Sequence, residues 1–237
     1  MSIKIGAQLY TLRDYCQTTD GFADTLARVA DMGYTTVQMS GCCAYEPEWF
    51  REQLEKNGLT CELTHFELED IVGDTDKLVA DHNVYGCKYI GMPAQYRGNT
   101  AKVAEFCDVF DAAATRIHEL GSQLMYHNHW FEYDDRGDGK NYMEMIAERF
   151  TPEQLGFTLD TYWVAFAGYD VVSEIERLSG RLPRVHLKDM EILPDGTRRY
   201  APASLTSRRS WRLLKRREPE LPLSNRTSAL SATRLTV

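Results

Sequence analysis

Short apolar and β-branched runs alternate with longer segments of mixed polarity through roughly the first two hundred residues. The short runs are typical of buried strands, and the longer segments place apolar residues three and four apart, as on one helix face. Strands that alternate with helices indicate βα units and a parallel sheet. The pattern predicts strands at 3–9, 35–39, 59–66, 87–92, 123–128, 155–160 and 184–187, and helices at 20–32, 46–57, 74–85, 100–120, 142–149 and 170–178.

Two α/β architectures share this rhythm, the (β/α)₈ barrel and the doubly wound sheet. The predicted strands follow one another at intervals of roughly 25 to 30 residues, which is the spacing of a (β/α)₈ barrel. A doubly wound sheet that binds a dinucleotide carries a glycine-rich turn after its first strand. The first predicted strand contains Gly6-Ala7-Gln8 instead, and no GxGxxG follows it. We therefore expect one (β/α)₈ TIM barrel over residues 1–200, with about seven βα units.

Composition excludes several classes of protein. With 43% hydrophobic and 26% charged residues, the chain has the make-up of a folded globular protein. No apolar run approaches the roughly 20 residues that a membrane span needs, and the N-terminus opens into the first strand without a secretory signal. The six cysteines show no CxxC spacing, so we expect reduced thiols, a cytoplasmic location and no membrane partner.

The net charge of −8 hides two parts of opposite sign. Residues 1–200 carry 19 basic and 33 acidic side chains, whereas residues 201–237 carry 8 basic and 2 acidic ones. A body this acidic repels nucleic-acid phosphates, so we expect no nucleic-acid partner. The tail has no glycine and one aromatic residue, Trp211, and it follows neither a strand nor a helix period. We interpret 201–237 as an atypical basic tail that is either disordered or the product of a shifted reading frame.

Acids and imidazoles gather where the predicted strands end, and this is the rim where (β/α)₈ barrels keep their reactive groups. Carboxylates and imidazoles together bind divalent cations such as Mn²⁺, Mg²⁺, Co²⁺ or Zn²⁺. The set therefore predicts a metal centre on one rim of the barrel. The residues concerned are His65, Glu67, His127, His129, Glu132, Asp160, Trp163, His186, Lys188 and Asp189.

Each of these residues also has an ordinary structural explanation. Asp160 is suited to cap a following helix, and His186 could be a core histidine bonded to the backbone. Because side chains alternate along a strand, only one of His127 and His129 is expected to point into the site. Trp163 and its aromatic neighbours either form an apolar wall for a sugar ring or simply pack.

Three strand-end segments, 126–132 (YHNHWFE), 159–163 (LDTYW) and 185–189 (VHLKD), together with the opening segment 6–13 (GAQLYTLR), resemble a known family. They are similar to the motifs of the sugar phosphate isomerase/epimerase family, in the xylose-isomerase-like TIM barrel superfamily. That superfamily includes inosose dehydratase, hydroxypyruvate isomerase and the ketose 3-epimerases. The resemblance covers roughly residues 1–200.

In that family two glutamates, an aspartate and a histidine hold one divalent metal. The resemblance implies Asp160 and His186 as ligands, with Glu132 as the candidate for the first glutamate. Many relatives carry that glutamate at the end of strand five, where this chain has His127, so His127 or His129 either replaces it or binds substrate. We expect the catalytic residues to be Glu132, His127 and Lys188, and the substrate-binding residues to be His65, His129 and Trp163.

The implied chemistry is proton transfer next to a carbonyl group. A cation that contacts the carbonyl and its neighbouring hydroxyl stabilises the enediolate that forms when the intervening carbon loses its proton. A carboxylate or imidazole removes the proton, and another group returns it. Return to a different carbon isomerises the substrate, return to the opposite face epimerises it, and loss of hydroxide dehydrates it. The motifs predict a small polyhydroxylated substrate, namely a sugar, a sugar phosphate or a cyclitol, without choosing among the three outcomes.

The tail departs from the resembled family. Relatives continue with a glycine-bearing loop, a seventh helix and an eighth strand that ends in the fourth ligand, a glutamate. Nothing after residue 200 matches this, so we expect the eighth strand to be missing or altered and the edges of strands one and seven to be exposed. Within the tail, only Glu218 and Glu220 could replace the lost glutamate.

The incomplete ligand set leaves an alternative to an active enzyme. The chain could be a catalytically impaired, truncated barrel, or a non-catalytic binding protein that retains a partial metal site. Association into a homo-oligomer would protect an open barrel edge. The endonuclease relatives that act on abasic DNA use three metals and many more histidines, so a chain with six histidines and an acidic body fits them poorly.

Overall fold

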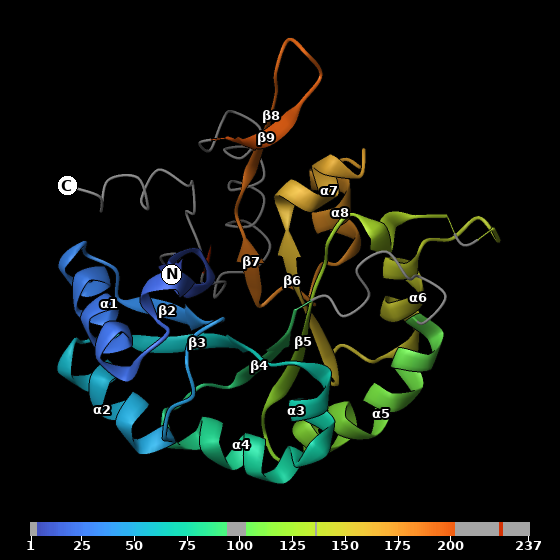
Figure 1. Ribbon diagram of the computed structural model, residues 1–237. Coiled ribbons are helices and arrows are strands. Elements are labelled where there is room, and N and C mark those ends of the chain that lie inside the picture. The colour runs from blue at the N-terminus through green and yellow to red at the C-terminus, as the bar shows by residue number, and fades with distance from the viewer. Residues whose placement is uncertain (1–3, 94–102, 136, 202–222, 225–237) are drawn as a thin grey trace.

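Eight parallel strands form a closed barrel in the computed structural model, which describes residues 4–93, 103–135, 137–201 and 223–224. The strands follow the order β1-β10-β7-β6-β5-β4-β3-β2 around the barrel. The predicted fold class is therefore confirmed (Figure 1). The barrel strands are β1 Ile5–Gln8, β2 Thr36–Met39, β3 Thr60–His65, β4 Tyr89–Met92, β5 Gln123–His127, β6 Leu155–Asp160, β7 Arg184–His186 and β10 Leu223–Ser224.

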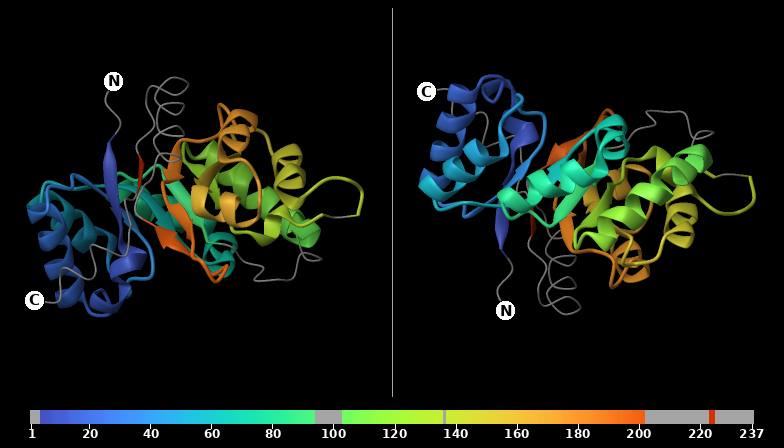
Figure 2. Two further views of the ribbon diagram at one scale, coloured as in Figure 1. Left: turned by 90° about the horizontal axis from the view of Figure 1, so that it is seen from above. Right: turned by 90° about the horizontal axis from the view of Figure 1, so that it is seen from below.

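The helices cover the outside of this sheet in chain order (Figures 1 and 2). Side-chain caps fix several of their starts: Thr18 accepts a hydrogen bond from the Gly21 amide before α1, and Asn141 forms a capping box with Glu144 before α6. Gly33 follows α1 with a φ of 90°, a conformation that favours glycine. The helices are α1 Thr19–Asp31, α2 Pro47–Lys56, α3 Leu68–Gly73, α4 Thr75–Val84, α5 Val103–Glu119, α6 Tyr142–Arg149, α7 Thr161–Phe166 and α8 Val171–Arg177, with short 3₁₀ helices at Leu9–Tyr15 (η1) and Phe131–Tyr133 (η3).

The predicted eighth strand is altered rather than missing. The tail supplies β10, which pairs in parallel with β1 through Ile5↔Leu223 and with β7 through Leu223↔Val185. We expected the edges of strands one and seven to be exposed. This is wrong where β10 lies, because the backbones of Leu223 and Ser224 pair with both β1 and β7. The prediction that the remainder of 202–237 is disordered lies outside the described residues.

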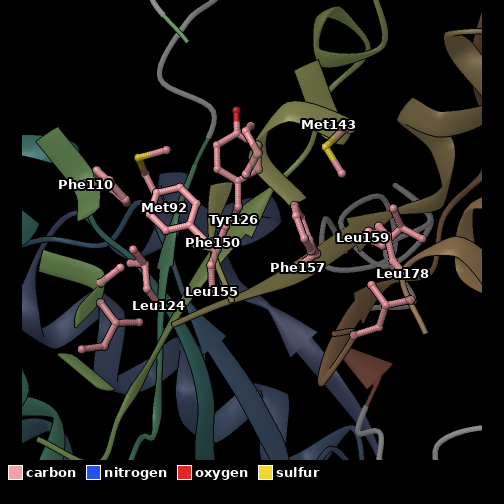
Figure 3. Close-up of a cluster of buried hydrophobic side chains, with 14 of the residues drawn as sticks. Met92, Phe110, Leu124, Tyr126, Met143, Phe150, Leu155, Phe157, Leu159 and Leu178 are labelled. Carbon is pink, nitrogen blue, oxygen red and sulfur yellow. The ribbon is translucent and has the colours of Figure 1, made fainter. Parts of the chain in front are cut away.

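The core lies between the strands and the helices that surround them. Tyr126 of β5 and Phe157 of β6 pack there with Phe110 of α5, and all three side chains are fully buried (Figure 3). All six residues of β6 are buried, as expected of a strand with both faces covered. The six cysteines are free thiols, as predicted. Within the described part of the chain, none of the helices has the length and apolar character needed to cross a membrane.

An antiparallel hairpin that we did not predict extends the chain after β7. It consists of β8 (Asp189–Ile192) and β9 (Arg198–Ala201), and it projects from the top of the barrel in Figure 1. Its base lies directly after the end of β7 and so at the carboxyl-terminal rim. The rim is where the predicted site residues should meet.

Candidate metal centre and active site

One oxygen of Asp160 is the centre of the site. Asp160 ends β6, and its Oδ1 accepts a hydrogen bond from the Tyr162 amide at 3.1 Å, which caps α7. Its Oδ2 faces three nitrogen atoms: His127 Nε2 at 3.3 Å, His186 Nδ1 at 3.5 Å and Lys188 Nζ at 2.7 Å. Asp160 therefore caps a helix and also holds a buried negative charge among these three side chains.

Three of these residues form a group with the geometry of a metal site. His127, Asp160 and His186 each offer one ligand atom, and these atoms all lie within 4.8 Å of one another. The three side chains come from the ends of β5, β6 and β7, which are neighbours in the barrel, and all three are buried. Two imidazoles and a carboxylate are a ligand set that suits divalent transition metals.

The protonation states of the three side chains are those that a metal site needs. Burial lowers the pKa of His127 to about 4 despite the neighbouring Asp160, and burial also lowers the pKa of His186, so both imidazoles are neutral near pH 7. Burial alone would raise the pKa of Asp160, but the Lys188 ammonium and the two histidines outweigh it and hold that pKa well below its usual range. Neutral imidazoles and an ionised carboxylate are the protonation states that bind a metal.

Gln38 of β2 lies next to His186 and bears on which nitrogen of that imidazole is available to a cation. Gln38 Oε1 lies 2.7 Å from His186 Nε2, and in the tautomer that donates this hydrogen bond the lone pair of His186 Nδ1 faces Asp160 Oδ2. Two acceptor atoms 3.5 Å apart repel each other in a buried place unless a positive charge lies near them, and here the Lys188 ammonium, 2.7 Å from Asp160 Oδ2, supplies that charge. Among the described residues, neither His186 Nδ1 nor His127 Nδ1 has a hydrogen-bond partner. The residues present therefore fit a divalent cation.

His65 lies beside this group at the end of β3. Its ring centroid is 5.3 Å from that of His127 and 5.9 Å from that of His186. Its Nδ1 lies 3.3 Å from Ser40 Oγ, and its buried Nε2 has no hydrogen-bond partner in the described part of the chain. Gly91 on the adjacent β4 permits this placement, because a Cβ there would lie 2.7 Å from His65 Cδ2.

His129 and Trp163 form an aromatic wall next to the group. The His129 ring centroid lies 4.8 Å from that of His127 and 5.1 Å from that of Trp163, with 30° between the His129 and Trp163 planes. On its other side His129 stacks on Phe131 at 5.6 Å. His127 thus belongs to the metal group and His129 to the wall beside it. The expectation that only one of the two would point into the site is wrong, because residues two apart on a strand share a face and their rings lie 4.8 Å apart.

Comparison with known protein families agrees with the barrel fold. A family model described as a xylose isomerase-like TIM barrel matches residues 26–219. This chain belongs to the xylose isomerase-like TIM barrel family. The match extends past residue 200, beyond the point where the tail changes in composition.

Relatives of known structure or curated function are distant. Inosose dehydratase of Geobacillus kaustophilus (strain HTA426) is 23% identical over 192 residues, which cover 70% of this chain. The matched part is 61% of that relative's length. A sugar phosphate isomerase/epimerase from Parabacteroides distasonis ATCC 8503 superposes with a TM-score of 0.75 at 18% identity, covering 94% of this chain and 88% of that one. The probable 3-DHS dehydratase from Bacillus anthracis superposes with a TM-score of 0.71 at 12% identity, covering 99% of each chain. Likeness at these identities shows the shared fold.

Glu132 is a predicted ligand of this xylose isomerase-like barrel that lies outside the metal group. It does not belong to the group of His127, Asp160 and His186. Instead it lies in η3 with its side chain fully buried, where Oε1 accepts a hydrogen bond from the Tyr126 hydroxyl at 2.7 Å and Oε2 accepts one from the His129 amide at 2.8 Å. Both carboxylate oxygens thus accept hydrogen bonds that hold the loop carrying His129, and the role of Glu132 as a ligand or base stays a prediction.

The structure also brings in residues that the sequence analysis missed. Asn128 links the end of β5 to the end of β6 through two hydrogen bonds. Its Oδ1 accepts a hydrogen bond from the Asp160 amide at 2.7 Å, and its Nδ2 donates one to the Asp160 carbonyl at 3.3 Å. Thr161 Oγ1 accepts from the Lys188 amide at 2.9 Å and so positions the Lys188 backbone. Gln38 and Ser40, at the end of β2, could have been found by extending the search for polar strand ends to strand two. Glu218 and Glu220, the predicted replacement ligands, lie outside the described residues.

Proposed function

We propose that this protein is a divalent-metal-dependent isomerase, epimerase or dehydratase that acts on a small sugar, sugar phosphate or cyclitol through an enediolate. The observation that carries the proposal is the convergence of His127, Asp160 and His186 at the ends of three neighbouring strands. The names of relatives, namely inosose dehydratase, sugar phosphate isomerase/epimerase and 3-DHS dehydratase, are consistent with this class of chemistry.

His127, Asp160 and His186 are the proposed metal ligands. A divalent cation bound there supplies Lewis-acid stabilisation of the negative charge that develops on a substrate carbonyl and the adjacent hydroxyl. Gln38 orients the imidazole of His186 by accepting its Nε2 proton, and Asn128 fixes the backbone of Asp160. Such supporting contacts keep ligands in one orientation and one tautomer.

His65 is the group best placed to hold the transferred proton. When its Nδ1 proton is donated to Ser40 Oγ, its Nε2 carries a lone pair beside the metal group. Burial, together with the neighbouring histidines and Lys188, lowers the pKa of His65 well below its usual value, so the ring is neutral. The same shift makes it a weaker base than a free imidazole, and its suitability as the proton acceptor therefore rests on its position and on the Nε2 lone pair. Because both carboxylate oxygens of Glu132 are occupied, His65 takes the role that we had assigned to Glu132.

The aromatic wall and Lys188 complete the proposed binding site. His129 and Trp163 offer ring faces against which the C–H face of a sugar or cyclitol can pack. The Lys188 side chain is 16% exposed and pairs with Asp160, so it borders the part of the rim where a substrate would enter.

The test is hydrogen exchange at carbon, which isomerases, epimerases and dehydratases of this type share. The protein is incubated with Mn²⁺ in D₂O and a panel of ketoses, ketose phosphates and ketocyclitols, and loss of the C–H signal next to the carbonyl is followed by NMR. We expect exchange with at least one compound. Asp160→Asn should slow this exchange at least a hundredfold, and His65→Gln should slow it by a similar factor. His118→Ala, in an exposed histidine of α5, should leave it unchanged.

The outcomes separate the proposal from its alternative. If Mn²⁺ binds and no compound in the panel exchanges, the chain is a binding protein that retains a metal site, and the catalytic part of the proposal fails. If Asp160→Asn exchanges as fast as the wild type, the metal group has no part in the chemistry. Either result would contradict the proposed function.

A further inference from the structure

Lys188 occupies the same face of Asp160 that a metal ion requires. Its Nζ lies 2.7 Å from Asp160 Oδ2, the oxygen that also faces His127 and His186. The other oxygen, Oδ1, is engaged with the Tyr162 amide at the start of α7. A cation that binds all three ligands must therefore approach the oxygen that already contacts an ammonium group.

The two positive charges cannot easily share this oxygen. A metal ion at the usual coordination distance of about 2.1 Å from Oδ2 would lie at most about 5 Å from the ammonium, because the ammonium itself is 2.7 Å from that oxygen. Repulsion between a divalent ion and a lysine is strong at this separation in a buried place, where water screens it little. Binding of the metal thus favours movement of Lys188 away from Asp160.

The group is also balanced in charge without a metal. Among its described members, Asp160 carries one negative charge, Lys188 one positive charge, and the histidines none. Glu132, another predicted acid, is bonded to Tyr126 and the His129 amide instead. A divalent ion added beside Lys188 would leave an excess of positive charge, whereas a site without Lys188 would begin with a net negative charge.

We propose that Lys188 is the resident counter-charge of this site, so that a divalent ion binds by displacing its ammonium from Asp160 and the displaced side chain then faces the substrate. The inference rests on the proposed function in one respect, the identity of the metal ligands. Lys188 thus sets how tightly the chain holds its metal. It stabilises the metal-free protein, weakens metal affinity, and becomes available to substrate oxygens only in the loaded site.

The first test compares Mn²⁺ affinity in variants of Lys188 by calorimetric titration. Lys188→Met keeps most of the aliphatic length and removes the charge, and Lys188→Arg keeps the charge. We expect Lys188→Met to bind Mn²⁺ at least tenfold more tightly than the wild type, and Lys188→Arg to stay within about threefold of it. Lys140→Met is the matched control, since Lys140 pairs with Glu148 on an exposed surface, and its affinity should equal that of the wild type.

Metal-free stability gives a second readout in the same variants. With EDTA present, Lys188→Met should melt at a lower temperature than the wild type, because it leaves the buried Asp160 charge without its partner. With saturating Mn²⁺ this variant should gain more in melting temperature than the wild type does, since tighter binding stabilises the folded state more. Lys140→Met should show neither change.

The wild-type protein alone supplies a third test if Lys188→Met does not fold. Acetylation of lysines by an amine-reactive reagent is quantified by peptide mass spectrometry with and without Mn²⁺. We expect the labelling rate of Lys188 to rise at least threefold when Mn²⁺ binds, because the amine leaves its ion pair, while the rate at Lys140 stays constant.

Failure of the inference and failure of the proposed metal site look different. If Mn²⁺ binds the wild type and Asp160→Asn abolishes binding, but neither Lys188→Met affinity nor Lys188 labelling changes, Lys188 is not a displaced counter-charge. If no variant binds Mn²⁺ even at millimolar concentration, the metal site itself is contradicted, and the inference falls with it.

Discussion

Replacement of Glu132 by glutamine should change how the stability of the protein depends on pH. The carboxyl group is fully buried, and burial raises its pKa from 4.5 to about 7 in spite of the hydrogen bonds from Tyr126 and the His129 amide. Since one pKa unit corresponds to about 1.4 kcal/mol, ionising this group costs the folded state about 3 kcal/mol relative to the unfolded chain.

The direction of the effect follows from proton binding. Below pH 4.5 the carboxyl is protonated in both states, and its contribution to stability is fully present. Between pH 4.5 and 7 the folded protein keeps a proton that the unfolded chain has lost, so this contribution falls as the pH rises and is gone above about pH 7. A glutamine does not ionise, so the stability of Glu132→Gln does not fall in this way as the pH rises.

The amide has its own penalty, and it does not depend on pH. Its oxygen can accept the hydrogen bond from the His129 amide, but its NH₂ group must then donate to the Tyr126 hydroxyl, which reverses the bond that Glu132 Oε1 accepts. This rearrangement costs at most about 1 to 3 kcal/mol, at every pH. The informative quantity is therefore the difference in the free energy of unfolding between Glu132→Gln and the wild type, and how this difference changes with pH. From pH 4.5 to 8 this difference should shift by about 3 kcal/mol in favour of the variant.

Urea denaturation followed by tryptophan fluorescence in EDTA, at several values between pH 4.5 and 8, measures this difference. Glu48→Gln, in an exposed acid of α2, is the control, and it should not reproduce the shift of about 3 kcal/mol expected for Glu132→Gln. A constant difference for Glu132→Gln would refute the account of Glu132. So would a loss of Mn²⁺ affinity as large as that of Asp160→Asn, because it would make Glu132 a ligand after all.

Two further variants probe the support around the metal group. Gln38→Leu removes the acceptor of the His186 Nε2 proton and should weaken Mn²⁺ binding at least tenfold by calorimetry, whereas Gln123→Leu, at the opposite end of β5, should not alter it. Gly91→Ala places a Cβ 2.3 Å from the Thr64 carbonyl oxygen and should lower the free energy of unfolding by about 2 kcal/mol. Gly73→Ala, which meets nothing within 4 Å, should be neutral or slightly stabilising in the same denaturation assay, and an equal loss in both glycine variants would contradict the packing argument.

The barrel could be predicted from the sequence because its signals are local. Each of the seven predicted strands lies within a few residues of an observed one, because a buried strand can be recognised in the sequence as a short apolar run. The eighth strand carried no such signal. The pairing of Leu223 and Ser224 is set by the gap between β1 and β7, which is a property of the closed barrel and not of the tail's own residues.

The site could be predicted only in part, for a related reason. Asp160 and His186 end their strands, so the rule for strand ends places them at the rim. Glu132 follows a loop after β5, and its sequence position does not reveal that η3 turns its carboxylate back onto Tyr126. The contact of Lys188 with Asp160 likewise depends on the path of the chain between β7 and β8, which sequence periodicity does not describe.

Anomalous diffraction from crystals soaked in Mn²⁺ tests the central claim most directly. The account predicts one strong peak within coordination distance of Asp160 Oδ2 and of one nitrogen each from His127 and His186, with Lys188 Nζ moved away from that oxygen. A peak on Glu132, or no peak between these three side chains at saturating Mn²⁺, would contradict it.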